Sequence, residues 1–172
     1  INYSLYLNTA LFETAKILIK ELNFLKGLFF QYKFSDNKLE CEFELFNKEK
    51  PDYSEPDLKK FIETNFTVNN LQDIAALGYS TTFYSLIKKF KIKVSDFKLT
   101  SSIFPNNSIF LLPINIPEQY FGFFLFFPDD IKYIENDFIF SIFDNVNEQI
   151  KSYYKNISNR KIIENIISNI PS

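Results

Sequence analysis

Three glutamates at alternate positions, Glu40, Glu42 and Glu44, are the first residues whose types and spacing suggest chemistry. Two neighbouring carboxylates can act as general acid and general base when an apolar environment raises the pKa of one of them. The residues between and beside these glutamates are apolar: Leu39, Cys41, Phe43 and Leu45. Strict alternation is typical of a half-buried strand, and it predicts that the glutamates face water. We therefore interpret them as a solvated strand face rather than as a catalytic pair.

Most other kinds of catalytic site need residues that this chain does not have, because it contains no His and a single Cys, Cys41. Nucleophile triads, imidazole zinc sites and the ordinary axial ligation of haem depend on His, and an iron–sulfur cluster needs several Cys. Carboxylate-only metal binding has two candidates, Asp52 and Asp129-Asp130, but both stand in predicted turns, where Asp is common. We predict no catalytic residues, no metal site and no enzyme activity.

Charge and hydropathy restrict the kinds of molecule that this chain is expected to bind. The net charge is −2, and the one basic cluster, 88–93 (KKFKIK), is interpreted as a solvated helix end, with anion capture as the alternative. Nucleic-acid binding needs a concentrated basic surface, so no nucleic-acid partner is expected. No apolar run approaches the length of about 20 residues that spans a bilayer, and no secretory signal is present. These features predict a cytoplasmic domain without membrane contact.

Length and composition predict one globular domain. The chain has 172 residues, 46% of them hydrophobic and 23% charged, which suffices for a core without disulfides. Aromatic residues reach 19%, with 22 Phe and 10 Tyr but no Trp, which reflects either codon bias or a binding site. The chain begins at Ile1 and lacks Met, so we expect a piece of a longer protein.

The first half of the chain predicts a helix, a hairpin and a helical middle. Apolar residues at helical spacing indicate a helix over 4–22. Residues 24–34 and 39–45 are predicted strands around the turn Ser35-Asp36-Asn37, with Gln31 and Lys33 facing water beside the glutamates. Three short helices are then expected at 55–65, 70–77 and 81–90, capped or ended by Ser54, Gly78 and Ser80.

The second half predicts the centre of the sheet and a long helix. Residues 95–104 alternate as a strand, and Ser108–Ile114 and Tyr120–Phe127 are almost wholly apolar, as central strands covered on both faces are. A helix over 136–156 carries a seam for a partner helix: Ile139, Phe143, Val146, Ile150, Tyr153 and Ile157. The helical phase breaks at Ser158-Asn159-Arg160, which marks a kink or a new cap. We therefore divide the chain into a domain at 1–157 and a helical extension or linker at 158–172.

The order of these elements and four short motifs resemble the GAF family of sensory domains. The motifs are Leu112-Pro113-Ile114, Phe121-Gly122-Phe123, Pro128-Asp129-Asp130 and Glu135-Asn136-Asp137. The resemblance implies an α+β fold: an antiparallel sheet of five or six strands, with the terminal helices on one face and a helical insert on the other. PAS-like folds are the second choice. It also implies a homodimer through the terminal helices and a small-molecule pocket beneath the insert.

The departures from the family pattern leave the cofactor unknown. Cyclic-nucleotide-binding members show an Asp-Glu dipeptide that this chain lacks. A bilin-binding member needs a suitably placed Cys and usually a nearby His, whereas Cys41 lies in the inward row of a predicted strand. Cyclic nucleotide, bilin and haem are therefore disfavoured.

The resemblance places the pocket between the insert and the strands beneath it. Its expected lining is Phe66, Tyr79, Thr82, Phe83, Leu86, Phe97 and Leu99, with Ser80, Thr81 and Lys88 as polar anchors. The leading hypothesis is a regulatory domain of a larger, bacterial-type signalling protein, which binds a small molecule and signals through 136–156 to an effector domain. The alternative is that the rings fill this space, which leaves a ligand-free dimerisation module of the same fold.

Overall fold

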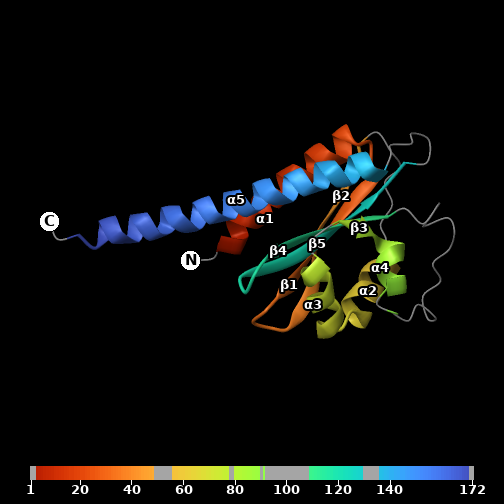
Figure 1. The fold of residues 1–172 in the computed structure, drawn as a ribbon, viewed down its shortest axis with the longest axis horizontal. Helices are drawn as coiled ribbons and strands as arrows, with labels where there is room; N and C mark the ends of the chain where they lie inside the picture. Colours follow the sequence, from red (N-terminus) through yellow and green to blue (C-terminus); the bar gives the residue numbers. More distant parts are fainter. Residues whose placement is uncertain are drawn as a thin grey trace.

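The computed structural model describes residues 3–48, 56–77, 80–89, 91, 109–129 and 136–170. Figure 1 shows their arrangement. The elements in chain order are α1 (Tyr3–Glu21), β1 (Lys26–Lys33), β2 (Lys38–Phe46), α2 (Pro56–Asn65), α3 (Val68–Leu77), β3 (Thr81–Thr82), α4 (Phe83–Lys89), β4 (Phe110–Ile116), β5 (Tyr120–Phe127) and α5 (Asn136–Ser168). The predicted strand at 95–104, the Ser54 cap and Gly78 lie outside the described residues. Within these ranges, no helix combines the length and hydropathy needed to cross a membrane.

The architecture is the predicted α+β arrangement. The antiparallel sheet has the order β2-β1-β5-β4-β3. Helices α1 and α5 cover one face, and α2, α3 and α4 lie on the other (Figure 1). Each face has its own apolar core. We call the core between the sheet and helices α1 and α5 the helix-pair layer, and the core between the sheet and helices α2, α3 and α4 the insert layer.

Strand β5 is the centre of the sheet, as predicted from its apolar sequence. It pairs with β1 on one side and with β4 on the other. Every residue of β5 is buried, because alternate side chains enter the two layers: Phe123 and Leu125 pack in the insert layer, and Phe124 and Phe126 in the helix-pair layer. An uninterrupted apolar run is therefore what this position requires.

Gly122 in β5 allows neighbouring β1 to approach closely. A Cβ atom at this position would lie 2.6 Å from Cζ of Phe29 and 2.6 Å from the carbonyl oxygen of Phe30, both on neighbouring β1. Real Cβ atoms do not tolerate such distances from backbone atoms. A glycine is thus required for β1 and β5 to pair here.

The prediction of one apolar face on β2 is wrong, because the strand contains a bulge. Phe29 of β1 pairs with Phe43, but the next residue, Phe30, pairs with Cys41. Glu42 therefore has no residue opposite it in the β1 strand. An extra residue in one strand shifts the side-chain alternation by one position. Consequently Leu39 and Cys41 pack toward the insert layer, whereas Phe43 and Leu45 pack toward the helix-pair layer.

The prediction that Gln31 faces water is also wrong. Gln31 is 6% exposed, because β1 lies between β2 and β5 and is covered on both faces. Its side-chain oxygen accepts a hydrogen bond from Nδ2 of Asn8 on α1 at 3.0 Å. Lys33, at the end of β1, remains partly exposed and forms an ion pair with Glu42 at 2.7 Å.

Helices α3 and α4 are capped by residues that the sequence did not predict as caps. Thr82, not Ser80, caps α4, because its Oγ1 accepts the N–H of Ser85 at 3.2 Å. The helix begins two residues later than predicted, since Thr81 and Thr82 pair with β4. At α3, Oγ1 of Thr67 accepts the N–H of Asn70 at 3.1 Å, and Oδ1 of Asn70 accepts the N–H of Thr67 at 3.0 Å. This reciprocal pair satisfies two amide groups that the helix leaves free.

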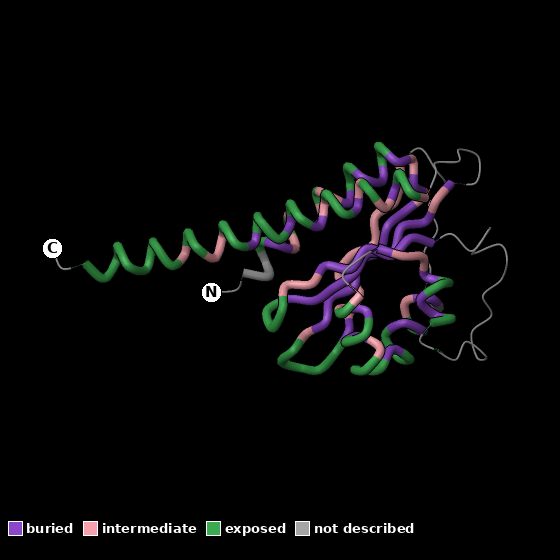
Figure 2. The backbone as a smooth tube through the Cα atoms, in the orientation of Figure 1, coloured by how far each residue is buried: buried purple, intermediate pink, exposed green. Residues whose placement is uncertain are grey.

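Helix α5 is one continuous helix of 33 residues, so residues 158–160 form neither a helix end nor a new cap. Its first part packs on the body through buried Ile139, Phe143, Ile150 and Tyr154, and its last part projects beyond the sheet (Figure 1). Figure 2 shows that this projecting part is exposed. The phase break at 158–160 instead marks the point where the apolar residues move to another face of the same helix.

Candidate functional site

The described members of the predicted pocket come together beneath the insert. Phe66, Phe83 and Leu86 are buried in the insert layer. The ring of Phe66 stacks against Phe83 with centroids 6.2 Å apart, and against Phe123 of the sheet at 6.1 Å. These rings occupy the space between insert and sheet at this point. Tyr79, Phe97 and Leu99 lie outside the described residues.

The predicted polar anchors occupy different environments. Ser80 is 8% exposed, and its hydroxyl has no hydrogen-bond partner. Thr81 and Thr82 are half-buried, and Thr82 serves as the cap of α4. Lys88 is exposed, with its Nζ 5.7 Å from the ring centroid of Tyr84. Ser80 is therefore the anchor with unused hydrogen-bonding capacity inside the core, where such a group is costly unless something satisfies it.

Most of the predicted helix seam faces the protein's own sheet and α1. Ile139, Phe143 and Ile150 are 2%, 0% and 5% exposed in the helix-pair layer, and Val146 packs at its edge. Ile157 is half-buried and Tyr153 is 43% exposed, and the neighbouring Tyr154 is buried instead. Whether this helix also pairs with a second copy stays a prediction.

A chain of buried and half-buried polar groups crosses the helix-pair layer. The hydroxyl of Tyr120 donates to Oδ1 of Asn8, whose Nδ2 donates to the side chain of Gln31. The three residues come from β5, α1 and β1. Burial, together with the nearby charge of Glu42, raises the pKa of Tyr120 far above its ordinary value, so its hydroxyl keeps its proton.

Cys41 is a structural thiol. Burial is the largest cause that raises the pKa of Cys41, the charges of Glu44 and Glu63 add to it while Lys59 opposes them, and the resulting pKa is about 11. Its backbone N–H, on the outer edge of β2, donates to the carboxylate of Glu63 on α2 at 3.0 Å. Since a thiol with such a pKa is a poor nucleophile at neutral pH, Cys41 is not prepared for covalent attachment of a ligand.

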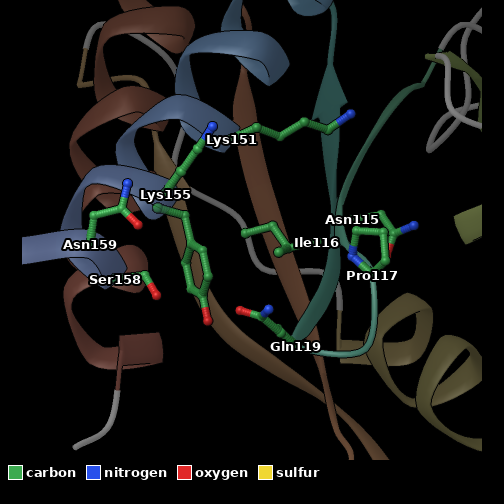
Figure 3. A pocket seen from close by; sticks show the side chains of 9 residues that line it. Asn115, Ile116, Pro117, Gln119, Lys151, Lys155, Ser158 and Asn159 are labelled. Atoms are coloured by element: carbon green, nitrogen blue, oxygen red, sulfur yellow. The ribbon is translucent and has the colours of Figure 1, made fainter. Parts of the chain in front are cut away.

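A cleft that the sequence did not predict lies between the β4–β5 turn and α5. It has a volume of about 320 Å³. Its walls come from two segments far apart in the chain: Asn115, Ile116, Pro117 and Gln119 on one side, and Lys151, Tyr154, Lys155, Ser158 and Asn159 on the other. Figure 3 shows Ile116 and Gln119 pointing toward α5. The polar residues at 151, 155, 158 and 159 share one face of α5 and are the only indication of this cleft in the sequence. Only the fold places that face opposite the turn.

In the part of the chain that the structure describes, no three or more Cys, Asp or Glu side chains cluster as metal ligands would. Two acidic residues of β2 instead form ion pairs with lysines: Glu42 with Lys33, and Glu44 with Lys59 at 3.0 Å. The Glu row thus has a structural use along the edge strand.

Comparisons with known proteins bear on the fold. No protein-family model and no curated protein matches the sequence. The chain is similar to a solved structure described as the red light-absorbing state of NpR6012g4, a red/green cyanobacteriochrome, with 10% identity over 89% of this chain and 96% of that chain, and a TM-score of 0.51. The green light-absorbing state of the same protein gives 10% identity, 84% and 91% coverage, and a TM-score of 0.48. The first similarity covers most of both chains and is consistent with the observed α+β fold. The chain is therefore a domain with a GAF-like fold.

Proposed function

We propose that this chain is a non-catalytic sensory domain that transmits a change in helix packing through α5. The observation that carries the proposal is the continuity of α5 from its contact with the sheet to its exposed projecting end. A single helix rises 1.5 Å per residue and is stiff, so a displacement at its seated end reaches its free end. In a larger signalling protein, an effector domain such as a cyclase, phosphodiesterase, kinase or phosphatase would receive it in the cytoplasm.

The projecting end of α5 has an apolar face that we call the isoleucine stripe: Ile162, Ile163, Ile166 and Ile167, which are between 53% and 61% exposed. An α-helix turns by about 100° per residue, so Ile166 lies about 160° around the axis from buried Ile150. The stripe therefore points away from the side that packs on the body. An apolar face of this kind is suited to a second helix, and we propose that two copies pair through it.

Signalling would follow as a shift in population. A ligand that binds one arrangement of the insert or of the helices more tightly than another changes the relative populations of these arrangements. The paired stripes would convert that shift into a change of helix register or rotation.

The pairing is tested by light scattering on the purified chain and on two glutamate variants. I166E introduces a charge into the stripe, where Ile166 is 60% exposed, and I17E introduces the same charge on α1, where Ile17 is 62% exposed. We expect the unmodified chain and I17E to have the mass of a dimer and I166E that of a monomer, with unchanged circular dichroism. A monomeric unmodified chain, or a dimeric I166E, would contradict the proposal.

A ligand-free dimerisation module is the second candidate. It is favoured by the stacked rings of Phe66, Phe83 and Phe123, which fill the space where the pocket was predicted. A thermal-shift screen with nucleotides and common metabolites separates the two candidates. No shift with any compound would favour the module, whereas a saturable shift would favour the sensor.

A further inference from the structure

We propose that the cleft between the β4–β5 turn and α5 is a binding site for a small phosphorylated molecule, held by Lys151 and Lys155. The cleft is lined by residues of α5 and of the β4–β5 turn. Helix α5 and the insert helices cover opposite faces of the sheet (Figure 1), so this site is separate from the pocket predicted beneath the insert. It adds a ligand site to the proposed function, and binding can be measured whether or not α5 transmits a signal.

The charge of the cleft favours an anion. Lys151 and Lys155 are one helical turn apart, so their side chains leave the same face of α5. The nine lining residues include no carboxylate. Lys151 has a long contact of 3.9 Å with Glu148, which is 78% exposed and therefore only weakly paired. In the described ranges, no carboxylate forms an ion pair with Lys155.

The hydrogen-bonding groups of the cleft favour a phosphate over a simpler anion. Ser158 and Asn159 continue the lysine face one turn further along α5, and Gln119 reaches toward them from the turn (Figure 3). A tetrahedral phosphate can accept hydrogen bonds from both walls at once, because its oxygens point in different directions. A carboxylate has only two acceptor oxygens, whose lone pairs lie in one plane, so it offers fewer directions for hydrogen bonds from the two walls.

The remaining lining residues indicate that the ligand carries an apolar part. Ile116 and Pro117 contribute apolar surface on the sheet side, and Tyr154, which is 8% exposed, contributes its ring on the helix side. The volume of about 320 Å³ lies at the lower end of small-molecule sites. The expected ligand is thus a small phosphate monoester with a short apolar body.

Occupancy of this site would act on α5 directly. The lysine, serine and asparagine groups lie where the helix leaves the sheet, and the opposite wall belongs to the antiparallel β4–β5 hairpin. A ligand that contacts both walls would hold the helix to the hairpin. Binding here would therefore favour the arrangement of α5 in which it is seated on the sheet.

The test is a titration of the chain with phenyl phosphate, inorganic phosphate and phenol at constant ionic strength, followed by amide chemical shifts in nuclear magnetic resonance spectra. Phenyl phosphate should bind most tightly and phenol most weakly, with the largest shift changes at 115–119 and 151–159. The variant K151Q/K155Q should bind phenyl phosphate about tenfold more weakly or worse. The matched variant K16Q/K20Q replaces a lysine pair with the same spacing on α1 and should bind normally.

Three outcomes would overturn the site. These are unchanged binding by K151Q/K155Q, equal weakening by K16Q/K20Q, and equal affinity for phenol and phenyl phosphate. Circular dichroism verifies that both lysine variants are folded, and the single variant K155Q provides a second measurement with less change to the surface. Light scattering on the same samples keeps a failure of binding distinct from a failure of helix pairing.

Discussion

The hydroxyl of Tyr120 donates a hydrogen bond to Oδ1 of Asn8 and so joins the central strand β5 to α1 inside the helix-pair layer. Asn8 in turn donates to Gln31 on β1. Three elements are thereby tied together by polar groups in a layer that is mostly apolar. Such a network is specific in geometry, because each member needs its partner at one position.

Removing the Tyr120 hydroxyl should destabilise the domain. Y120F leaves the Asn8 oxygen without its donor in a mostly buried site, which costs about 1–3 kcal/mol of unfolding free energy. Urea denaturation measures the loss. The exposed Tyr84 is the control, because it is 47% exposed and Y84F keeps the ring beneath Lys88. Equal stability of Y120F and the unmodified chain would show that the network contributes nothing.

Adding a methyl group to Gly122 should be far more damaging than adding one to Gly27. The new Cβ would lie 2.6 Å from the Phe30 carbonyl oxygen, which belongs to the backbone and cannot rotate away. At Gly27 the nearest atom is Cε1 of the Phe126 ring at 2.9 Å, and a side chain can adjust. We expect G122A to lose about 3 kcal/mol or more and G27A about 1 kcal/mol. Thermal unfolding of both variants checks this order.

Replacing Asn147 by leucine should stabilise the domain. Asn147 is 7% exposed on the seated face of α5, and its Oδ1 has no hydrogen-bond partner. An apolar residue of similar size removes that penalty, which is worth about 1 kcal/mol. The exposed Asn156 on the same helix provides the control variant N156L. A lower melting temperature for N147L would mean that the amide has an undetected role in seating the helix.

Cys41 should be unreactive in the folded chain. Its pKa is raised from 9.0 to about 11, so its thiolate fraction at about pH 8 falls roughly a hundredfold below that of the unfolded chain. Modification by Ellman's reagent should be slow in buffer and fast in urea. Rapid labelling of the folded chain would contradict the burial.

The same shift has a consequence for stability at alkaline pH. Above about pH 9 the unfolded chain releases the Cys41 proton while the folded chain retains it, so stability falls as the pH rises toward 11. The contribution is fully present below pH 9. C41A removes this thiol and should flatten that part of the stability profile, although the Tyr120 hydroxyl adds a decline of the same sign above about pH 10. An identical profile for C41A would contradict the assignment.

The sequence by itself determined most of the described elements and the central strand of the sheet. The apolar run of Tyr120–Phe127 requires cover on both faces, and that requirement alone makes it the central strand. Helical spacing placed α1 and the beginning of α5 to within one residue. Hydrophobic periodicity reports burial, and burial is what local sequence can encode.

Only the tertiary structure decided which residues meet. The bulge at Glu42 divides an unbroken alternation between two layers, and the pairing of β1 with β5 buries Gln31. The cleft joins residues 115–119 to residues 151–159, which no local pattern connects. The roles of the predicted anchors Thr81 and Thr82 likewise depend on the pairing of these two residues with β4. Sites and registers arise from contacts between distant segments, and their energies depend on the assembled fold rather than on the spacing of residues along the chain.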